Sequence, residues 1–170
     1  KARGIDARFV ATGQIGITIV GTGVPLDAVR VDYASGSIEA EVMAQAEGSL
    51  LLVEGQGSLI HTASPATLPL LRGSCPTHLV LCVRAGQERL LRVPWVEIPP
   101  LRRFAQMYED LAEACGAFAR PKCAGVALNT FGMPVEVAQG WVERIAEETG
   151  LPTCDPVRDG AETLVDALMA

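Results

Sequence analysis

Residues 49–59 of the chain, SLLLVEGQGSL, carry the first indication of the fold. The apolar run from Leu50 to Val53 does not alternate with polar residues, which is typical of a strand buried on both faces of a parallel sheet. The run stops at Glu54, and glycines then alternate with polar residues. Ligands of open parallel sheets bind beyond the carboxyl ends of the strands. The stretch therefore predicts an interior strand ending beside a polar ligand, although a tight turn would use the same glycines.

Other apolar runs alternate with helical patterns along the chain. Strands are expected at Arg8–Thr12, Ser49–Glu54, His78–Val83 and Cys123–Asn129, with a short one near Thr153–Val157. Helices are expected at Ser37–Glu47, Pro100–Phe118 and Pro134–Thr149, and a last one begins at Asp159 with Glu162 in capping-box spacing. This order predicts an α/β fold, a three-layer, mostly parallel sheet with helices on both faces. The proline-rich segment Gln87–Pro100 is expected to be a surface loop.

Composition limits the kinds of partner. With 170 residues we expect a single α/β domain over residues 1–170. The formal net charge of −6 argues against a nucleic-acid surface, and no apolar run approaches the ~18 residues that span a membrane. Five scattered cysteines without a CxxC pair indicate reduced thiols, of which Cys82 and Cys123 are expected in the core. We expect a cytoplasmic protein that acts on a small molecule.

Polar, glycine-containing segments follow all four main strands. They are Ala11–Gly16, Glu54–Ser58 with His61 beyond it, Arg84–Glu88 and Asn129–Gly132. Glu54 is a candidate magnesium ligand, or a solvated loop carboxylate. His61 is a candidate general acid or base, or a surface histidine. Asn129 is a candidate for recognising a nucleotide base, or the cap of the next helix.

A phosphate-binding loop is missing from the sequence. Nothing matches G-x-x-x-x-G-K-[ST], and the nearest glycine cluster, VGTGVP at 20–25, has no lysine. The 170 residues therefore do not contain a complete nucleotide site of that kind.

Four segments together resemble a known family. They are KARGIDARFVATGQIGI, VEGQGSL, VALNTFG and GLPTCDPVRDGAETLVDAL, at 1–17, 53–59, 126–132 and 150–168. They resemble the carboxyl-terminal half of a prokaryotic family long classed as a domain of unknown function. Some members of that family are described as D-glutamate N-acetyltransferases (DgcN-type), paired with an enolase-superfamily partner enzyme. The resemblance implies a P-loop domain similar to dethiobiotin synthetase. It also implies that Lys1 lies in the helix after the phosphate loop, within a longer two-domain protein.

The resemblance also implies roles for particular residues. Gly13 and Gln14 would face the phosphate or substrate. An acidic, glycine-lined wall would be formed by Glu54, Gly55, Gln56, Gly57 and Ser58. A region that binds the nucleotide base would be formed by Asn129, Thr130, Pro156 and Val157. The chain departs from the family pattern at three places. A threonine is expected where Ile15 stands, and a Pro-Ala pair is expected after His61, where the chain has Thr62 and Ala63. A histidine is also expected near Arg84.

Three functions stay open at this point. The first is acetyl transfer from acetyl-CoA to D-glutamate, with Glu54 or His61 as the base and the amides of Gly55–Gly57 stabilising the oxyanion. The second is an ATP- and magnesium-dependent, ligase-like or nucleotide-binding protein similar to dethiobiotin synthetase. The third is a non-catalytic assembly module. Pairing into a homo-oligomer would cover exposed apolar surface, with Trp95 as an interface anchor.

Overall fold

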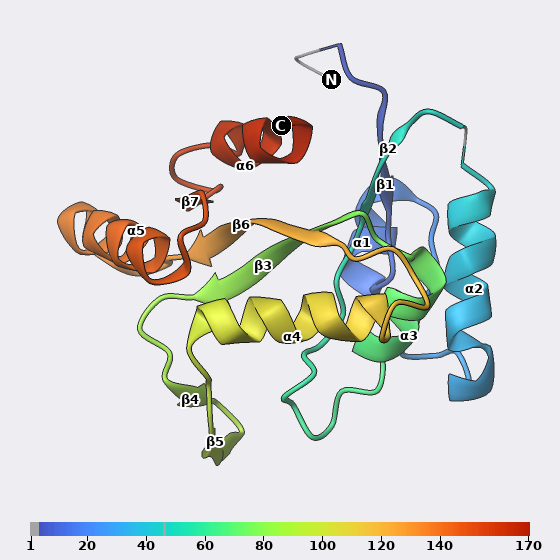
Figure 1. Cartoon of the computed structure of the whole chain (residues 1–170), viewed down its shortest axis with the longest axis horizontal. Helices are drawn as coiled ribbons and strands as arrows, with labels where there is room; N and C mark the ends of the chain where they lie inside the picture. The colour runs from blue at the N-terminus through green and yellow to red at the C-terminus, as the bar shows by residue number, and fades with distance from the viewer. Residues whose placement is uncertain (1–3, 46) are drawn as a thin grey trace. The chain divides into compact units, whose positions relative to one another are not determined.

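The computed structural model describes residues 4–45 and 47–170 of the chain. It divides into two compact units, residues 1–75 (unit 1) and residues 76–170 (unit 2), each with its own parallel sheet (Figure 1). The expected helix end at Lys1 lies outside the described residues, as does Ala46 within the expected helix Ser37–Glu47. The predicted α/β fold with parallel sheets and flanking helices is confirmed, with one parallel sheet in each unit.

Unit 1 is built on two parallel strands, β1 (Ala7–Val10) and β2 (Leu50–Val53). Ala7 pairs with Leu50 and Val10 with Val53, so both strands end at the same level. Three helices accompany the strands: α1 (Gln14–Val20), α2 (Val31–Met43) and α3 (Thr67–Ser74). Leu26, Ala34, Ile38 and Leu70 form one apolar core cluster of the unit.

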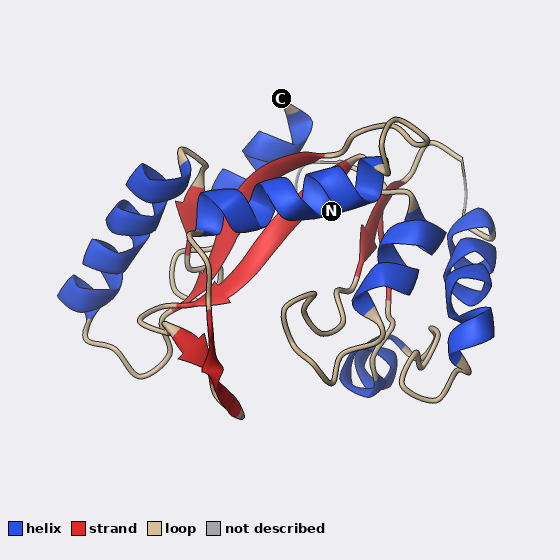
Figure 2. Ribbon diagram, turned by 60° about the horizontal axis from the view of Figure 1, so that its bottom comes forward, coloured by secondary structure: helices blue, strands red, loops and turns tan. Residues whose placement is uncertain are grey.

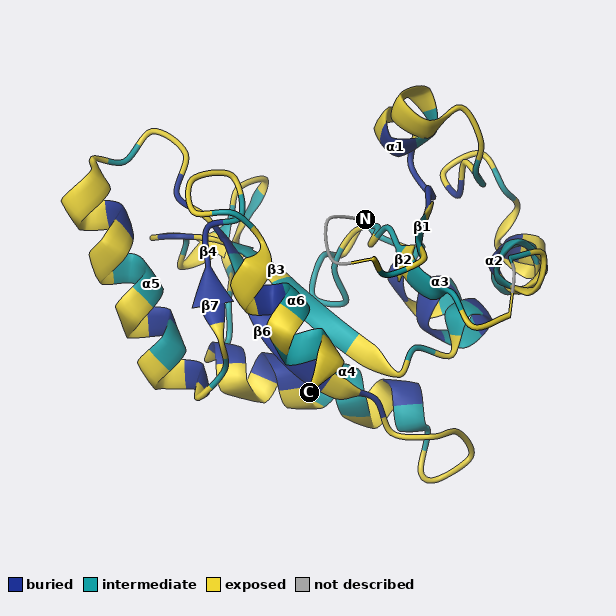
Figure 3. Cartoon of the chain, turned by 90° about the horizontal axis from the view of Figure 1, so that it is seen from above, coloured by how far each residue is buried: buried dark blue, intermediate teal, exposed yellow. Residues whose placement is uncertain are grey.

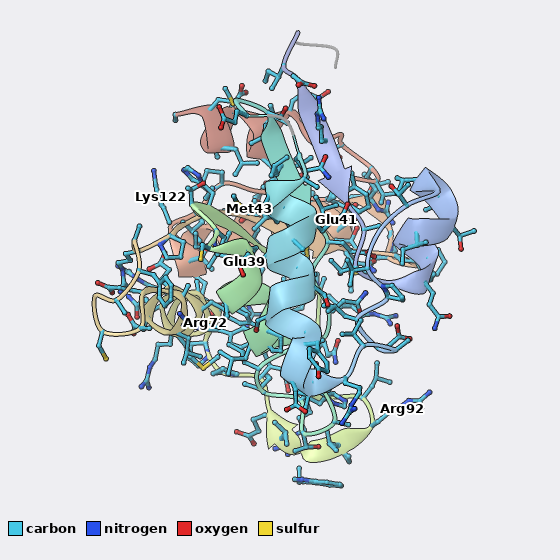
Figure 4. The ribbon with its side chains drawn as sticks, turned by 90° about the vertical axis from the view of Figure 1, so that its right-hand side faces the viewer. Glu39, Glu41, Met43, Arg72, Arg92 and Lys122 are labelled. Carbon is cyan, nitrogen blue, oxygen red and sulfur yellow. The ribbon has the colours of Figure 1, made fainter. Side chains whose placement is uncertain are left out.

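Helix α2 packs with one face inward and the other toward solvent. Ala34 and Ile38 are buried, whereas Glu39 and Met43 are exposed on the outer face that Figure 4 views. Helix α3 approaches α2 closely at Gly73, where an added Cβ would lie 2.3 Å from the backbone oxygen of Ser35. This tight contact holds α3, and with it the segment that follows β2, against the core.

Unit 2 is built on three parallel strands in the order β3–β6–β7. Their bounds are His78–Arg84, Lys122–Asn129 and Thr153–Cys154. Helices α4 (Leu101–Glu113), α5 (Val135–Thr149) and α6 (Glu162–Met169) accompany the sheet, and Figure 1 shows α4 and α6 on opposite sides of β6. The backbone N–H of Leu101 donates to Glu148 at 2.7 Å, which ties α4 to α5.

The segment Gln87–Pro100 was expected to be a loop, and this is wrong. It contains the antiparallel strands β4 (Arg89–Leu90) and β5 (Val93–Glu97), which Figure 2 shows as a hairpin apart from the parallel strands of unit 2. An ion pair between Arg89 and Glu97 joins the two strands. Trp95 is 72% exposed on β5, and its role as an interface anchor stays a prediction.

Several other expectations need correction. Helices α1 and α3 were missed, α2 begins at Val31 in place of Ser37, and α4 ends at Glu113 in place of Phe118. The last helix begins at Glu162 after Ala161, without a side-chain cap, so the expected capping box is wrong. Helix α5 confirms its prediction: it ends at Thr149, and Gly150 follows it in the left-handed region.

The strands differ in how far they are buried. Most of β6 is buried, as expected for a strand paired on both sides, whereas β1, β2 and β3 are only partly buried (Figure 3). In the described part of the chain, β3 pairs with β6 alone. The prediction that Cys82 is a core residue is therefore wrong, because it lies exposed on this edge strand, while Cys123 on β6 is buried as predicted.

Candidate functional site

The carboxylate of Glu54 ties the ends of β1 and β2 together in unit 1. Its Oε2 accepts hydrogen bonds from the backbone N–H groups of Thr12 and Gly13, each at 2.9 Å. The Thr12 hydroxyl donates to the backbone oxygen of Glu54 at 2.8 Å. The structure thus brings Gly13 and Glu54 together, and it adds Thr12, which the sequence interpretation missed although this residue ends the first expected strand.

Glycines leave room for this carboxylate. A Cβ added at Gly16 would lie 2.3 Å from Glu54 Oε2, and one added at Gly13 would lie 2.0 Å from Gln56 Nε2. Such distances are far inside van der Waals contact, so any side chain here would push Glu54 or Gln56 aside. The loop between β1 and α1 is therefore shaped to receive the two polar side chains that follow β2.

Gln14 turns toward a residue that the sequence interpretation did not single out. Its Nε2 donates to Asp27 Oδ2 at 2.7 Å on the exposed surface of unit 1. Nothing in the sequence pattern indicated Asp27, because it stands in the irregular segment between α1 and α2. No hydrogen bond among the described residues uses the second carboxylate oxygen of Asp27, which can therefore accept from a ligand.

A pocket of about 590 Å³ lies in unit 1 beside the segment that follows β2. Its lining is partly polar and partly apolar, from Leu26, Asp27, Val29, Val31, Ala34, Gln56, Gly57, Ser58, His61, Ala63, Ser64, Pro65, Ala66 and Pro69. Gly57 has a φ of 66° and packs against Ser64, where an added Cβ would lie 1.5 Å from the Ser64 Oγ. Four of the predicted site residues thus share one pocket, whereas Gly55 is exposed and does not line it.

Hydrogen bonds within the segment hold the wall of this pocket. The backbone N–H of Ser58 donates to Ser64 Oγ at 3.2 Å, and the Thr67 hydroxyl donates to the Gln56 backbone oxygen at 2.9 Å. The Nδ1 of His61 accepts the Ala63 backbone N–H at 3.1 Å. The pocket therefore has a defined shape around the side chains of Ser58, His61 and Ser64.

Glu54 can offer one carboxylate oxygen to a magnesium ion. Oε2 accepts two backbone N–H groups, and no hydrogen bond among the residues that the structure describes uses Oε1, so Oε1 is the oxygen available to a metal ion. Among residues 4–45 and 47–170, no three His, Cys, Asp or Glu side chains are grouped to hold a metal ion. Magnesium often binds through one or two carboxylates together with water and substrate phosphates, so Glu54 fits this ion only in the company of a phosphate-bearing ligand.

In unit 2, the buried residue Asp155 organises the end of the sheet. It is 3% exposed, and its Oδ2 accepts the backbone N–H of Thr130 at 3.0 Å and the Thr130 hydroxyl in a short hydrogen bond. Its Oδ1 accepts the backbone N–H of Val157 at 3.0 Å and that of Arg158 at 3.3 Å. Burial by itself would raise the pKa of Asp155, but these hydrogen bonds outweigh it and hold the pKa below its ordinary value.

Arg158 completes this network. Its Nη2 donates to the backbone oxygen of Met133 at 2.6 Å and to that of Thr130 at 3.3 Å, while Nε lies 3.7 Å from Asp155 Oδ2. Together Asp155 and Arg158 fasten the β6–α5 loop to the β7–α6 loop. The sequence interpretation missed both residues, although the position of Asp155 directly after a short strand was a usable signal.

A second pocket, of about 690 Å³, lies at this end of unit 2. Phe131 and Val157, which are 82% and 93% exposed, border it together with Asn129 and Pro156 and with the cationic residues Arg84 and Arg158. Asn129 Oδ1 accepts the Phe131 backbone N–H at 2.9 Å. Thr130, predicted as a ligand contact, is buried behind the pocket, and its hydroxyl is used by Asp155.

Comparison with known proteins identifies the family. A family model described as the P-loop domain of a domain of unknown function, DUF1611, matches residues 1–165. The chain belongs to the DUF1611 family. A crystal structure of a DUF1611 family protein from Anabaena variabilis superposes on this DUF1611 chain with a TM-score of 0.96, at 48% sequence identity, over 99% of the chain and 49% of that protein.

Two curated relatives of the DUF1611 chain carry the same name, D-glutamate N-acetyltransferase. The protein from Tritonibacter scottomollicae is 39% identical over 100% of the chain and 51% of its own length. The protein from a Pseudoalteromonas species is 33% identical over 97% of the chain and 49% of its own length. The DUF1611 chain therefore spans about half the length of these relatives. None of its described helices has the length and apolar character needed to cross a membrane.

Proposed function

We propose that the protein containing this chain is a D-glutamate N-acetyltransferase, which moves the acetyl group of acetyl-CoA to the amine of D-glutamate. The observation that carries the proposal is the name shared by two relatives that match nearly the whole chain at 39% and 33% identity. The two pockets support it, because each has the chemistry that one of the two substrates requires.

The pocket of unit 1 suits the acyl acceptor. Its volume of about 590 Å³ is in the range of ordinary small-molecule sites. Asp27 supplies a negative charge for the ammonium group of an amino acid, while the hydroxyls of Ser58 and Ser64 and the ring of His61 supply hydrogen-bond donors for carboxylates. A small molecule that carries both charges matches this lining.

The pocket of unit 2 suits the nucleotide portion of acetyl-CoA. The exposed side chains of Phe131 and Val157 offer apolar surface to a purine ring, and the Asn129 amide nitrogen makes no hydrogen bond among the described residues. Arg84 and Arg158 in the same lining supply positive charge for phosphate groups. The Asp155 network holds this surface in place before a ligand binds.

The chemistry requires one acyl transfer and the loss of two protons from the amine nitrogen. A base removes a proton from the ammonium of D-glutamate, and the free amine attacks the thioester carbon. The new C–N bond forms and the C–S bond breaks as the tetrahedral intermediate collapses, and the CoA thiolate that leaves takes up the second proton, which the nitrogen loses as the amide forms. Glu54 is the proposed base through Oε1, and the amides of Gln56 and Gly57, two residues that line the pocket of unit 1, are the proposed oxyanion donors.

ATP-dependent chemistry is the second candidate. The family is described as a P-loop domain, and the single open oxygen of Glu54 fits magnesium bound together with a nucleotide phosphate. This candidate predicts ADP formation coupled to product, whereas the first predicts turnover without ATP. A non-catalytic assembly role predicts neither.

The proposal is tested by following CoA thiol release from acetyl-CoA with a thiol reagent, using the full-length protein with D-glutamate, with L-glutamate and without an amino acid. Release that depends on D-glutamate and needs no ATP supports acetyl transfer. Product that forms only with ATP and magnesium, together with ADP, would replace it by the second candidate. No turnover under either condition would refute both.

A further inference from the structure

His61 has a fixed tautomer in the pocket of unit 1. The backbone N–H of Ala63 lies 3.1 Å from His61 Nδ1. A backbone N–H can only donate, so Nδ1 must be the acceptor. In the neutral imidazole one ring nitrogen accepts and the other carries the proton. The proton of neutral His61 is therefore on Nε2.

The surrounding backbone keeps the ring in this position. The N–H of His61 donates to the Ser58 oxygen at 3.0 Å, and the His61 oxygen accepts the Ser64 N–H at 3.1 Å. Two successive turns thus anchor the residue on both sides of its Cα. No hydrogen bond among the described residues uses Nε2, so this N–H is available to a ligand.

The neighbouring groups define what that ligand is. Ser64 Oγ accepts the Ser58 N–H at 3.2 Å, and no hydrogen bond among the described residues uses the hydroxyl's own proton, which can be donated to a ligand. His61, Ser58 and Ser64 therefore offer donors in one pocket, while Asp27 offers the carboxylate. Asp27 and His61 are also the two ionisable residues in this lining. A lining with hydrogen-bond donors for a carboxylate and a carboxylate for an ammonium group matches an amino acid.

We propose that His61 binds a carboxylate of the acyl acceptor through a fixed Nε2–H donor, and that it does not act as the base. The identity of the acceptor as D-glutamate rests on the proposed function, whereas the donor role rests on the Ala63 contact. To accept a proton at Nε2, the neutral ring would need its hydrogen on Nδ1, where it would point at the Ala63 N–H. Two donors cannot share that position, so the proton of the ammonium goes to another group.

The tautomer can be measured directly. Two-bond ¹H–¹⁵N correlation spectra of the protein distinguish the two neutral imidazole forms. The resonances that disappear in H61Q and persist in H78Q belong to His61, since His78 lies on β3 in unit 2 with its Nδ1 next to Thr77. An Nε2–H pattern for His61 is expected. An Nδ1–H pattern at neutral pH overturns the proposal.

Two variants distinguish a donor role of His61 from a role as base, because each keeps the hydrogen bond of only one of the two ring nitrogens. In H61Q the amide nitrogen takes the place of Nε2 and still donates. In H61N the amide oxygen takes the place of Nδ1 and accepts from Ala63, but no donor reaches the ligand. We expect D-glutamate binding, measured by calorimetry, to stay within about threefold in H61Q and to weaken by about 10- to 100-fold in H61N.

The other outcomes are decisive as well. Equal binding by H61N, H61Q and wild type, with both variants losing about 10²- to 10⁴-fold in kcat, would make His61 the base and overturn the proposal. Equal loss of binding in both variants would overturn it too. If D-glutamate binds with the expected pattern but no acetyl transfer occurs, the proposed function fails and the donor role stands. If acetyl transfer occurs and H61N binds normally, only the donor role fails.

Discussion

Replacing Gly16 by alanine tests whether the Glu54 carboxylate is held as the structure shows. Alanine is favoured over glycine inside a helix by about 0.5–1 kcal/mol, so propensity alone predicts a gain. The added Cβ, however, would lie 2.3 Å from Glu54 Oε2 and 3.1 Å from the Ala11 Cβ. The carboxylate would have to move, and the hydrogen bonds from Thr12 and Gly13 would break.

The net effect of G16A on the free energy of unfolding can be estimated from these two contributions. Hydrogen bonds to a charged group contribute about 1.5–3 kcal/mol each. Losing two of them outweighs the gain in helix propensity, and G16A is expected to lower the free energy of unfolding by about 2 kcal/mol or more. For a protein of this size that corresponds to a fall in Tm of roughly 4–8 °C.

Gly36 provides the matched control. It lies inside α2, and an added Cβ would meet nothing within 4 Å. G36A should therefore raise the free energy of unfolding by about 0.5–1 kcal/mol. Urea titration followed by circular dichroism measures both variants. If G16A were as stable as G36A, Glu54 would not occupy the space beside Gly16, and the proposed arrangement of the loop would be wrong.

Three further substitutions probe the two sites. E54Q replaces one acceptor oxygen by a donor and should lower kcat by at least about 100-fold through loss of the base, so full turnover would remove Glu54 from the mechanism. D27N should weaken binding of D-glutamate by about tenfold while leaving acetyl-CoA binding unchanged, and calorimetry with each substrate separates the two effects. D155N should destabilise the protein by about 3 kcal/mol at neutral pH, because a buried amide nitrogen would face backbone N–H groups, whereas D159N at an exposed position should change little. Because the folded-state pKa of Asp155 is lowered, its contribution is present above about pH 3.9 and is lost as the pH falls through the folded pKa. The difference in stability between wild type and D155N should therefore narrow in acid, and a difference independent of pH would contradict the lowered pKa.

Strands β2, β3 and β6 could be predicted from the sequence because each contains a short run of apolar residues. The expected strand His78–Val83 corresponds to β3, which is one residue longer, and Cys123–Asn129 corresponds to β6. The hairpin of β4 and β5 could not be predicted in this way. Pro94 stands inside β5, and proline is a signal against a strand unless the strand lies at an edge.

The missed helices have a similar cause. In α1 the sequence QIGITIV is rich in β-branched residues, which favour strands, and in α3 Pro69 falls within the first turn, where a helix tolerates it. Their formation depends on what they pack against, as at Gly16 beside Glu54 and Gly73 beside Ser35. Local sequence preferences do not contain this information.

The candidate site was predicted in part. The sequence indicated Glu54 and the glycines around it, because a polar, glycine-rich segment follows an apolar run. It could not show that Oε2 of Glu54 is already occupied by Thr12 and Gly13, since that depends on the pairing of β1 with β2. Asp155 was overlooked because an aspartate before a proline resembles an ordinary turn residue. Only the tertiary structure shows that it is buried and bonded to Thr130.

The most direct test of acceptor binding in unit 1 is a titration of the ¹⁵N-labelled protein with D-glutamate, with and without acetyl-CoA. If the pocket holds the acyl acceptor, the amide resonances of Ser58, His61 and Ala63 should shift saturably, and L-glutamate should shift them less. If those resonances stay unchanged under both conditions while resonances of unit 2 such as Phe131 respond, the acceptor binds elsewhere and the assignment of the pocket is wrong.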